Sequence, residues 1–194
     1  MNYKAIDAGA EGLREVKVDP SWADLTVNAV KESTGDDYFD SYVDVVGSLD
    51  GYDLPVSKFT EYELLDGTMQ NNITFKEKRA TADRVPLWHK ENCIQCNQCA
   101  FVCPHATIRP FVLNDEQIAK LPEDEREDVL NLMGGPNTKG LKFRIQVSPM
   151  NCVGCGICFV QCPGKGGKKA LEMVEAKTQY HHEKAADILY KETE

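Results

Sequence analysis

The sequence predicts an α+β protein in which an internally duplicated region follows a mixed helical and irregular segment. A cysteine-containing run occurs twice, and Cys152 follows Cys93 by 59 residues, as do the later cysteines of the second run relative to the first. Residues 1–92 contain no cysteine, and their helical patterns are interrupted by Gly and Pro. Hydrophobic residues make up 42% and charged residues 27% of the 194 positions, as in ordinary globular proteins.

The net charge is −9, from 22 Lys and Arg against 31 Asp and Glu. This sign opposes contact with a phosphate backbone, so we expect no nucleic-acid partner. The N-terminus lacks a secretory pattern, and no run approaches the ~18 apolar residues of a spanning helix. We therefore expect no membrane partner and a cytoplasmic location, where paired cysteines more often bind metal or do redox work than form disulfides.

The cysteine-free segment is expected to contain three helices and one extended stretch. Apolar spacing predicts helices over 5–16 and 36–46. Asp19-Pro20 is a helix-start signal, and Trp22 behind it is expected in the core. Residues 54–59 are expected to be extended, and the charged run over 75–79 is expected to face solvent.

A second set of elements surrounds the second cysteine run. Asn114 and Asp115 are expected to cap a short helix that ends at Leu121, and a further helix is expected over 123–133 with its acidic run in solvent. After the last cysteine, residues 170–174 fit a strand or a helical turn. An amphipathic helix is expected around Ala185, Ile188 and Leu189, preceded by solvent-exposed His181 and His182.

Both cysteine runs have the spacing C-x2-C-x2-C-x3-C-P, which is typical of [4Fe-4S] proteins. Two residues between ligands allow a tight loop to bring three thiolates to three corners of a cluster. In the bacterial run the fourth cysteine ligates the other cluster. Cluster one is thus expected to use Cys93, Cys96, Cys99 and Cys162, and cluster two Cys152, Cys155, Cys158 and Cys103. These ligands predict a bacterial-type 2[4Fe-4S] ferredoxin-like domain with a pseudo-twofold repeat.

Two zinc sites are the alternative chemistry, and they would make the chain a zinc-stabilised interaction module. Zinc ribbons place a long loop between two C-x2-C pairs, whereas three cysteines here occupy seven residues. With clusters bound, burial and an acidic chain favour a low potential. Apolar residues between the ligands are expected to pack around the sulfurs; they are Ile94, Phe101, Val102, Val153, Ile157, Phe159 and Val160.

Several segments resemble pyruvate:ferredoxin (flavodoxin) oxidoreductase. They are Glu77-Lys78-Arg79, which is similar to the family's EKR segment, together with residues 13–18 with Trp22, 85–99, 101–105 and 169–173. We divide the chain accordingly into a helical linker (1–34), an EKR-type segment (35–84), a ferredoxin-like domain (85–175, with an insertion at about 112–140) and a C-terminal linker or helix (176–194).

The resemblance implies an electron-transfer module that relays electrons from a thiamine site to ferredoxin or flavodoxin. The pyruvate-binding domain, the thiamine diphosphate domain and the third cluster have no counterpart here, so we expect them in the remaining domains of a parent enzyme. The chain is thus expected to be a fragment, excised or independently expressed, that does not oxidise pyruvate alone. A stand-alone ferredoxin-type carrier or subunit is the alternative, although such carriers have no need of a long cysteine-free segment.

Charged residues near the clusters allow two further interpretations. Lys165, Lys168 and Lys169 either form a turn or form a basic rim that steers an acidic ferredoxin. His89 and His105 are expected close to cluster one, either as ordinary packing or surface residues or as groups that shift its potential.

Overall fold

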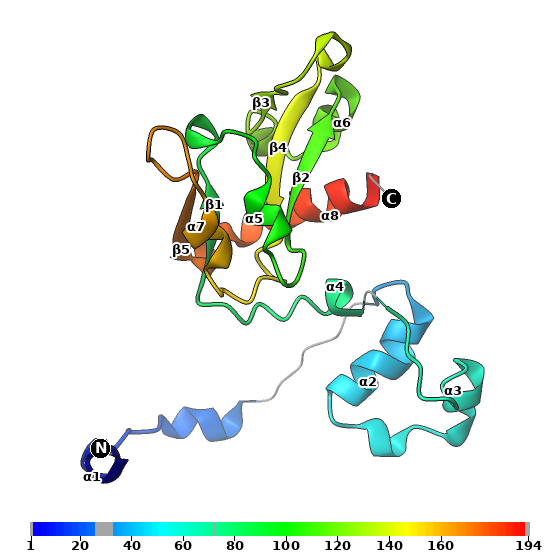
Figure 1. Cartoon of the computed structure of the whole chain (residues 1–194). Coiled ribbons are helices and arrows are strands. Elements are labelled where there is room, and N and C mark those ends of the chain that lie inside the picture. The colour runs from blue at the N-terminus through cyan, green and yellow to red at the C-terminus, as the bar shows by residue number, and fades with distance from the viewer. Residues whose placement is uncertain (1, 26–32, 72, 193–194) are drawn as a thin grey trace.

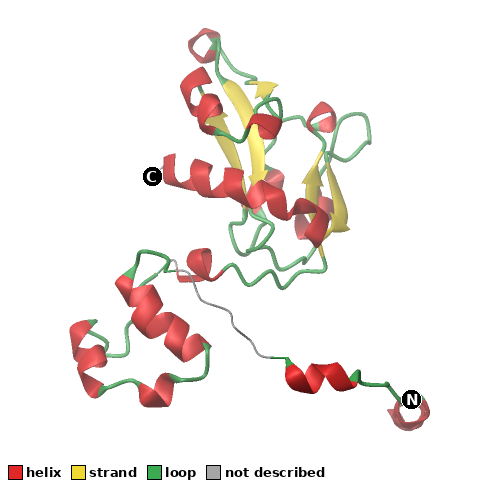
Figure 2. Cartoon of the chain, turned by 180° about the vertical axis from the view of Figure 1, so that it is seen from behind, coloured by secondary structure: helices red, strands yellow, loops and turns green. Residues whose placement is uncertain are grey.

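The computed structural model describes residues 2–25, 33–71 and 73–192. All five strands and helices α5 to α8 form one body, and helices α2 and α3 form a separate helical group (Figures 1 and 2). Mixed helices and two small sheets agree with the α+β class predicted from the sequence. No helix in the described ranges is long and apolar enough to cross a membrane.

The first elements are helix α1 (Asn2–Glu11) and the 3-10 helix η1 (Pro20–Asp24). The Asp19 side chain caps η1 by accepting a hydrogen bond from Ser21 N at 2.9 Å, as its sequence predicts. Helix α1 ends at Glu11 instead of continuing to Val16. The expectation that Trp22 lies in the core is wrong, because 60% of its surface is exposed.

The helical group begins with a continuous helix made of a π-helical turn, η2 (Phe39–Val43), and α2 (Asp44–Gly47), as predicted for 36–46. The 3-10 helix η3 (Gly51–Asp53) follows. The expected extended stretch is instead helix α3 (Val56–Glu61), with Pro55 at its N-cap, because the alternation of apolar residues is too short to specify a strand. Tyr38, Tyr42 and Tyr62 form the aromatic core of this helical group, and the rings of Tyr38 and Tyr62 meet edge to face with 5.0 Å between their centroids.

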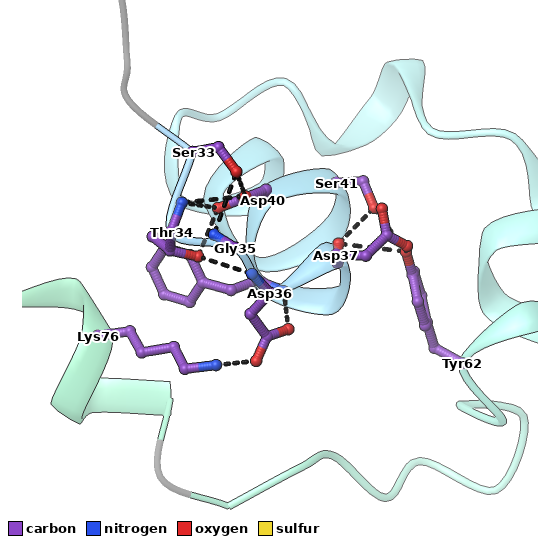
Figure 3. A network of polar contacts seen from close by, with 10 residues as sticks. Ser33, Thr34, Gly35, Asp36, Asp37, Asp40, Ser41, Tyr62 and Lys76 are labelled. Atoms are coloured by element: carbon purple, nitrogen blue, oxygen red, sulfur yellow. Dashed lines mark hydrogen bonds and ion pairs between the residues drawn. The ribbon is translucent and has the colours of Figure 1, made fainter. Parts of the chain in front are cut away.

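Polar contacts fix the start of this helical group (Figure 3). The Asp40 carboxylate accepts hydrogen bonds from the hydroxyls of Ser33 (2.6 Å) and Thr34 (2.7 Å), which lower its pKa. Tyr62 donates its hydroxyl to Asp37 at 2.5 Å. Asp36 forms an ion pair with Lys76 near helix α4 (Ile73–Glu77), so the charged run over 75–79 is partly engaged in the fold.

Two antiparallel sheets form the body. Strand β1 (Arg84–Trp88) pairs with β5 (Leu171–Glu175), so that Trp88 lies opposite Leu171. Strand β4 (Lys142–Val147) lies between β2 (Ile108–Leu113) and β3 (Leu130–Asn131). The prediction of a strand or helical turn over 170–174 is therefore confirmed as a strand.

In the segment between β2 and β4, one predicted helix is present and the other is wrong. Helix α6 (Asp115–Lys120) has the expected cap at Asn114, which forms a capping box with Gln117. The predicted helix over 123–133 is only the 3-10 turn η5 (Glu123–Glu125), followed by β3 and by η6 (Pro136–Thr138). The physical reason is Glu125, whose buried carboxylate turns inward to Arg144 and His182.

Short helices and two apolar cores complete the body. Helix α5 (Gln98–Phe101) and helix α7 (Ile157–Gln161) pack against each other, and η4 (Lys90–Asn92) precedes the first cysteine. Ile108, Phe143 and Leu171 belong to the core beside the cysteines. Phe111, Leu113 and Leu189 belong to the second core, under helix α8 (Glu183–Glu192), which follows η7 (Ala176–His182) where the amphipathic pattern predicts a helix.

Candidate iron-sulfur cluster sites

The two cysteine loops have matching backbone conformations. Gln95 and Gly154, which are 59 positions apart, have φ values of 57° and 69°. Their amides each donate a hydrogen bond of 3.4 Å to the sulfur of the first cysteine, Cys93 or Cys152. In each loop an amide donor therefore already points at the sulfur of the first cysteine.

The two left-handed positions are stabilised differently. At Gly154 a Cβ would lie 2.8 Å from the backbone oxygen of Arg84, so this position requires glycine. Gln95 carries a side chain, which donates to Asn131 O (2.8 Å) and accepts from Met133 N (2.9 Å). These hydrogen bonds tie the first cysteine loop to β3 and offset the conformational cost.

Each run places its third cysteine on a short helix and its fourth just after that helix. Cys99 lies in α5 and Cys158 in α7, behind left-handed N-cap residues. Cys103 follows α5, and its sulfur accepts hydrogen bonds from the amide of Thr107 (3.4 Å). The sulfur of Cys162 accepts from Ala170 N at 3.3 Å.

The structure gathers the eight cysteines around two cavities. One cavity is lined by Cys93, Cys96, Cys99 and Cys162. The other is lined by Cys152, Cys155, Cys158 and Cys103. The fourth cysteine of each run thus lies with the first three of the other run.

Lys169 has a structural contact that neither of its two interpretations, a turn or a basic rim, had included. Its ammonium donates to three backbone oxygens at the end of α7, those of Phe159, Val160 and Cys162, at 2.8 to 3.0 Å. A lysine that caps a helix C-terminus in this way is a structural cation. Lys165 and Lys168 form the turn favoured by the simpler interpretation.

Burial stabilises the neutral thiol of several cysteines relative to the thiolate. It raises the pKa of Cys99 to about 12 and that of Cys158 to about 11, and it also raises the pKa of Cys152. At Cys103 burial acts in the same direction, but hydrogen bonds from the hydroxyl and amide of Thr107 outweigh it and lower the pKa. Binding of iron to these thiolates must therefore release protons.

The donor set fits iron-sulfur clusters. Thiolates are the ligands that iron-sulfur clusters use, and the amides on sulfur add hydrogen bonds that such clusters accept. Trp88 lines the first cavity, and its buried indole nitrogen has no hydrogen-bond partner among the described residues. In those same ranges no three His, Cys, Asp or Glu side chains converge on a position for a single metal ion.

Two expectations for the surroundings need correction. His105 lines the cavity of Cys103 and Cys152 and so lies beside the second set, while His89 contacts Glu172 at 3.0 Å on the surface near the first. Phe101 and Val160 do not pack around the sulfurs, because 91% and 65% of their surfaces are exposed. Both lie on the outer faces of their short helices.

Thr107 and the capping role of Lys169 were not predicted. Thr107 follows Cys103 by four positions, whereas Ala170 follows Cys162 by eight, so the 59-residue offset does not align these positions. The sequence did hold a signal for Trp88 beside a cysteine loop, because it precedes Cys93 by five residues and the 59-residue offset places Val147 at the matching position before Cys152.

Comparison with known proteins agrees with this geometry. Residues 92–166 match the family described as the 4Fe-4S dicluster domain. The chain is 43% identical over 176 residues to pyruvate:ferredoxin oxidoreductase of Moorella thermoacetica, a match that covers 90% of this chain and 14% of the relative. This chain is homologous to a segment of the pyruvate:ferredoxin oxidoreductases.

Two further relatives contain a segment similar to this chain. Pyruvate-flavodoxin oxidoreductase of Klebsiella pneumoniae is 37% identical over 182 residues, covering 92% of this chain and 15% of the relative. The mitochondrial pyruvate dehydrogenase [NADP(+)] of Euglena gracilis is 37% identical over 180 residues, 92% of this chain and 9% of the relative. The chain thus spans about a seventh or less of the length of these three relatives. Its dicluster domain indicates two [4Fe-4S] clusters as cofactors.

Proposed function

We propose that this chain is the electron-transfer module of a pyruvate:ferredoxin oxidoreductase. Cys93, Cys96, Cys99 and Cys162 ligate cluster one, and Cys152, Cys155, Cys158 and Cys103 ligate cluster two. The observation that carries this assignment is the crossed lining of the two cavities. When bound, the clusters supply one-electron transfer at low potential.

The order of elements supports a pseudo-twofold arrangement of the domain over 85–175. The order strand, cysteine loop, helix and strand occurs as β1–α5–β2 and again as β4–α7–β5. Each strand of the first half pairs with a strand of the second, β1 with β5 and β2 with β4. The insertion at about 112–140 then corresponds to the segment with α6, β3 and η6.

The chain's own residues keep the two sites close to each other. Helices α5 and α7 pack against each other, and they carry Cys99 and Cys158, one from each ligand set. Both thiols are largely buried, and the charge of each set is felt at Cys99, where Cys93 and Cys158 both contribute to its raised pKa after burial. Such proximity favours transfer between the two sites.

The donor and the acceptor belong to the larger enzyme and its partners. The relatives are named for pyruvate, and their names give ferredoxin, flavodoxin or NADP(+) as the acceptor. We assign the donor to a thiamine diphosphate site and a third cluster in the remaining domains of the parent, and the acceptor to ferredoxin or flavodoxin in the cytoplasm. The helical linker (1–34), the EKR-type segment (35–84) and the C-terminal helix (176–194) connect the module to those domains.

Iron and acid-labile sulfide analysis of anaerobically purified chain tests the proposal, with EPR before and after dithionite. We expect about eight irons and about eight sulfides per chain, no signal when oxidised and two interacting clusters when reduced. Zinc without sulfide, and no signal in either state, would overturn the electron-transfer role in favour of a structural zinc module.

A further inference from the structure

The linings of the two cavities correspond residue by residue at most positions. Ile94, Pro163 and Ile145 border the first cavity, and Val153, Pro104 and Pro86 border the second at positions 59 residues away. The correspondence fails at three positions of each lining, Trp88, Ala170 and Leu171 in the first cavity and Thr107, Ile108 and Met173 in the second. Trp88 borders the first cavity, whereas Met173 borders the second without a counterpart in the first.

Trp88 is held firmly beside the first cavity. It is the last residue of β1, opposite Leu171 of β5, and its ring meets that of Phe143 edge to face at 6.4 Å between centroids. Its indole nitrogen is buried and has no hydrogen-bond partner among the described residues. Buried N–H groups in folded proteins are nearly always paired, so an acceptor is expected at this place.

We propose that the indole N–H of Trp88 donates a hydrogen bond to a sulfur of cluster one and thereby raises the potential of that cluster. This inference rests on the proposed function, because the acceptor is a sulfur of the bound cluster. Reduction adds negative charge to the cluster, so a donor to sulfur stabilises the reduced state more than the oxidised state. The cavity that Trp88 lines is also lined by Cys93, Cys96, Cys99 and Cys162, whose sulfurs are the ligands proposed for cluster one.

The second cavity uses a different donor. Met173 has no N–H or O–H in its side chain, but the hydroxyl of Thr107 lies 3.5 Å from the sulfur of Cys103. At the first cavity the amide donor to Cys162 comes from Ala170, whose side chain offers no hydroxyl. Each cluster therefore has one side-chain donor of its own, so a substitution at one should leave the other cluster unchanged.

A water molecule is the competing acceptor. A second hollow also borders Trp88 and is lined by Leu87 and Gln146 among others. If the indole N–H pointed to water there, its removal would leave the potential of cluster one unchanged. The two acceptors thus predict different results for the same substitution.

The first experiment is an anaerobic redox titration of the full chain followed by EPR, on Trp88→Phe, Thr107→Val and Trp22→Phe. Trp22 is the only other tryptophan and is 60% exposed, so Trp22→Phe is the matched control. For Trp88→Phe we expect about a tenfold lower equilibrium constant for reduction of cluster one, about 59 mV for a one-electron couple. Thr107→Val should lower the potential of cluster two instead, and Trp22→Phe should change neither.

A second measurement does not depend on substituting Trp88. In the Trp22→Phe chain, Trp88 is the sole tryptophan and can be labelled with ¹⁵N at the indole. Pulsed EPR of reduced cluster one should then detect the labelled nitrogen and its exchangeable proton. Their absence, or an unchanged potential in a fully loaded Trp88→Phe chain, would overturn the inference. If Trp88→Phe fails to bind cluster one, the labelled chain alone decides. Absence of iron and sulfide from the unsubstituted chain would instead overturn the proposed function.

Discussion

Replacing Lys78 with Met removes the central cation of a contact between the EKR segment and helix α8. The Lys78 ammonium pairs with Glu183 and with Asp187, the latter at 2.5 Å, and lies 4.3 Å from the centre of the Phe75 ring. Glu183 is buried, and its carboxylate also accepts from Ser148 Oγ (2.7 Å) and Met150 N (3.0 Å). The substitution keeps the length of the side chain and leaves Glu183 without its cation.

The size of the effect follows from how much charge remains buried and unpaired. Loss of one partner of a buried ion pair costs about 3–5 kcal/mol. Glu183 keeps two hydrogen bonds here, and the Asp187 side chain is 38% exposed, so we expect a smaller cost, just below that range, of about 2–3 kcal/mol. With an m-value of about 2 kcal/mol/M, the urea midpoint should fall by about 1–1.5 M.

Anaerobic urea titration of the loaded chain measures this shift by far-UV CD and by the cluster absorbance. Lys177→Met, at an exposed position, is the matched control and should leave the midpoint unchanged. Ala80 N donates to Met150 O at 2.8 Å, two residues before Cys152, so Lys78→Met should also release cluster two before cluster one. A midpoint equal to that of Lys177→Met would refute the idea that the EKR lysine anchors the cluster-two loop.

Three further substitutions test the ligand sets and the buried charges. Cys103→Ser should reduce the iron content from about eight to about four and abolish the EPR signal of cluster two, because cluster one keeps its four cysteines. Cys162→Ser should instead abolish the signal of cluster one and leave cluster two bound. Loss of cluster one from Cys103→Ser would disprove the crossed ligation. Glu125→Gln should lower the free energy of unfolding by about 3–5 kcal/mol, with exposed Glu123→Gln as its control. Burial acts to raise the pKa of Glu125, but the contacts with His182 and Arg144 outweigh it and lower the pKa below its ordinary 4.5. The stabilisation by the Glu125 carboxylate is therefore present above pH 4.5 and is lost as the pH falls through the lowered pKa. A constant difference in unfolding free energy between Glu125→Gln and Glu123→Gln from about pH 6 to about pH 3, as measured by urea titration, would contradict this. Lys169→Met should lower the free energy of unfolding by about 1.5–3 kcal/mol in the same titration, at low and high salt alike, whereas Lys168→Met should leave it unchanged. A decrease that disappears in high salt would indicate that Lys169 acts as a surface charge and not as a helix cap.

The grouping of the cysteines was the part of the site most accessible from the sequence. The spacing within each run determines which sulfurs share a loop, because two intervening residues cannot reach far, and the constant 59-residue offset indicates two equal halves. The cavity linings place four cysteines together at each site, and which sulfurs bind which cluster stays a prediction. Local signals were also sufficient for the caps at Asp19 and Asn114, since each depends on residues within a few positions.

The sequence did not reveal contacts that join distant parts of the chain. Trp22 has the spacing of a core residue, yet spacing alone does not supply a surface to pack against, and the residue is exposed. The acidic residues after Pro122 suit a helix start, but burial of Glu125 against Arg144, 19 residues away, favours a turn. His182, expected in solvent, contacts Glu125 at 3.0 Å for the same reason.

The errors at charged residues share a cause, which is that these residues were assigned to the surface by composition. Lys78, Glu125 and Lys169 each use their charge to join segments that apolar packing alone does not connect. Such contacts are needed here because the cysteine loops are short and their thiols, with pKa values raised by burial, stabilise no structure of their own before iron is bound. Lys169 secures the end of α7 next to Cys162, and Lys78 secures the approach to Cys152. The buried charges therefore hold the backbone in the arrangement in which four sulfurs face each cavity, and this is why their removal should be felt first as weaker retention of the clusters.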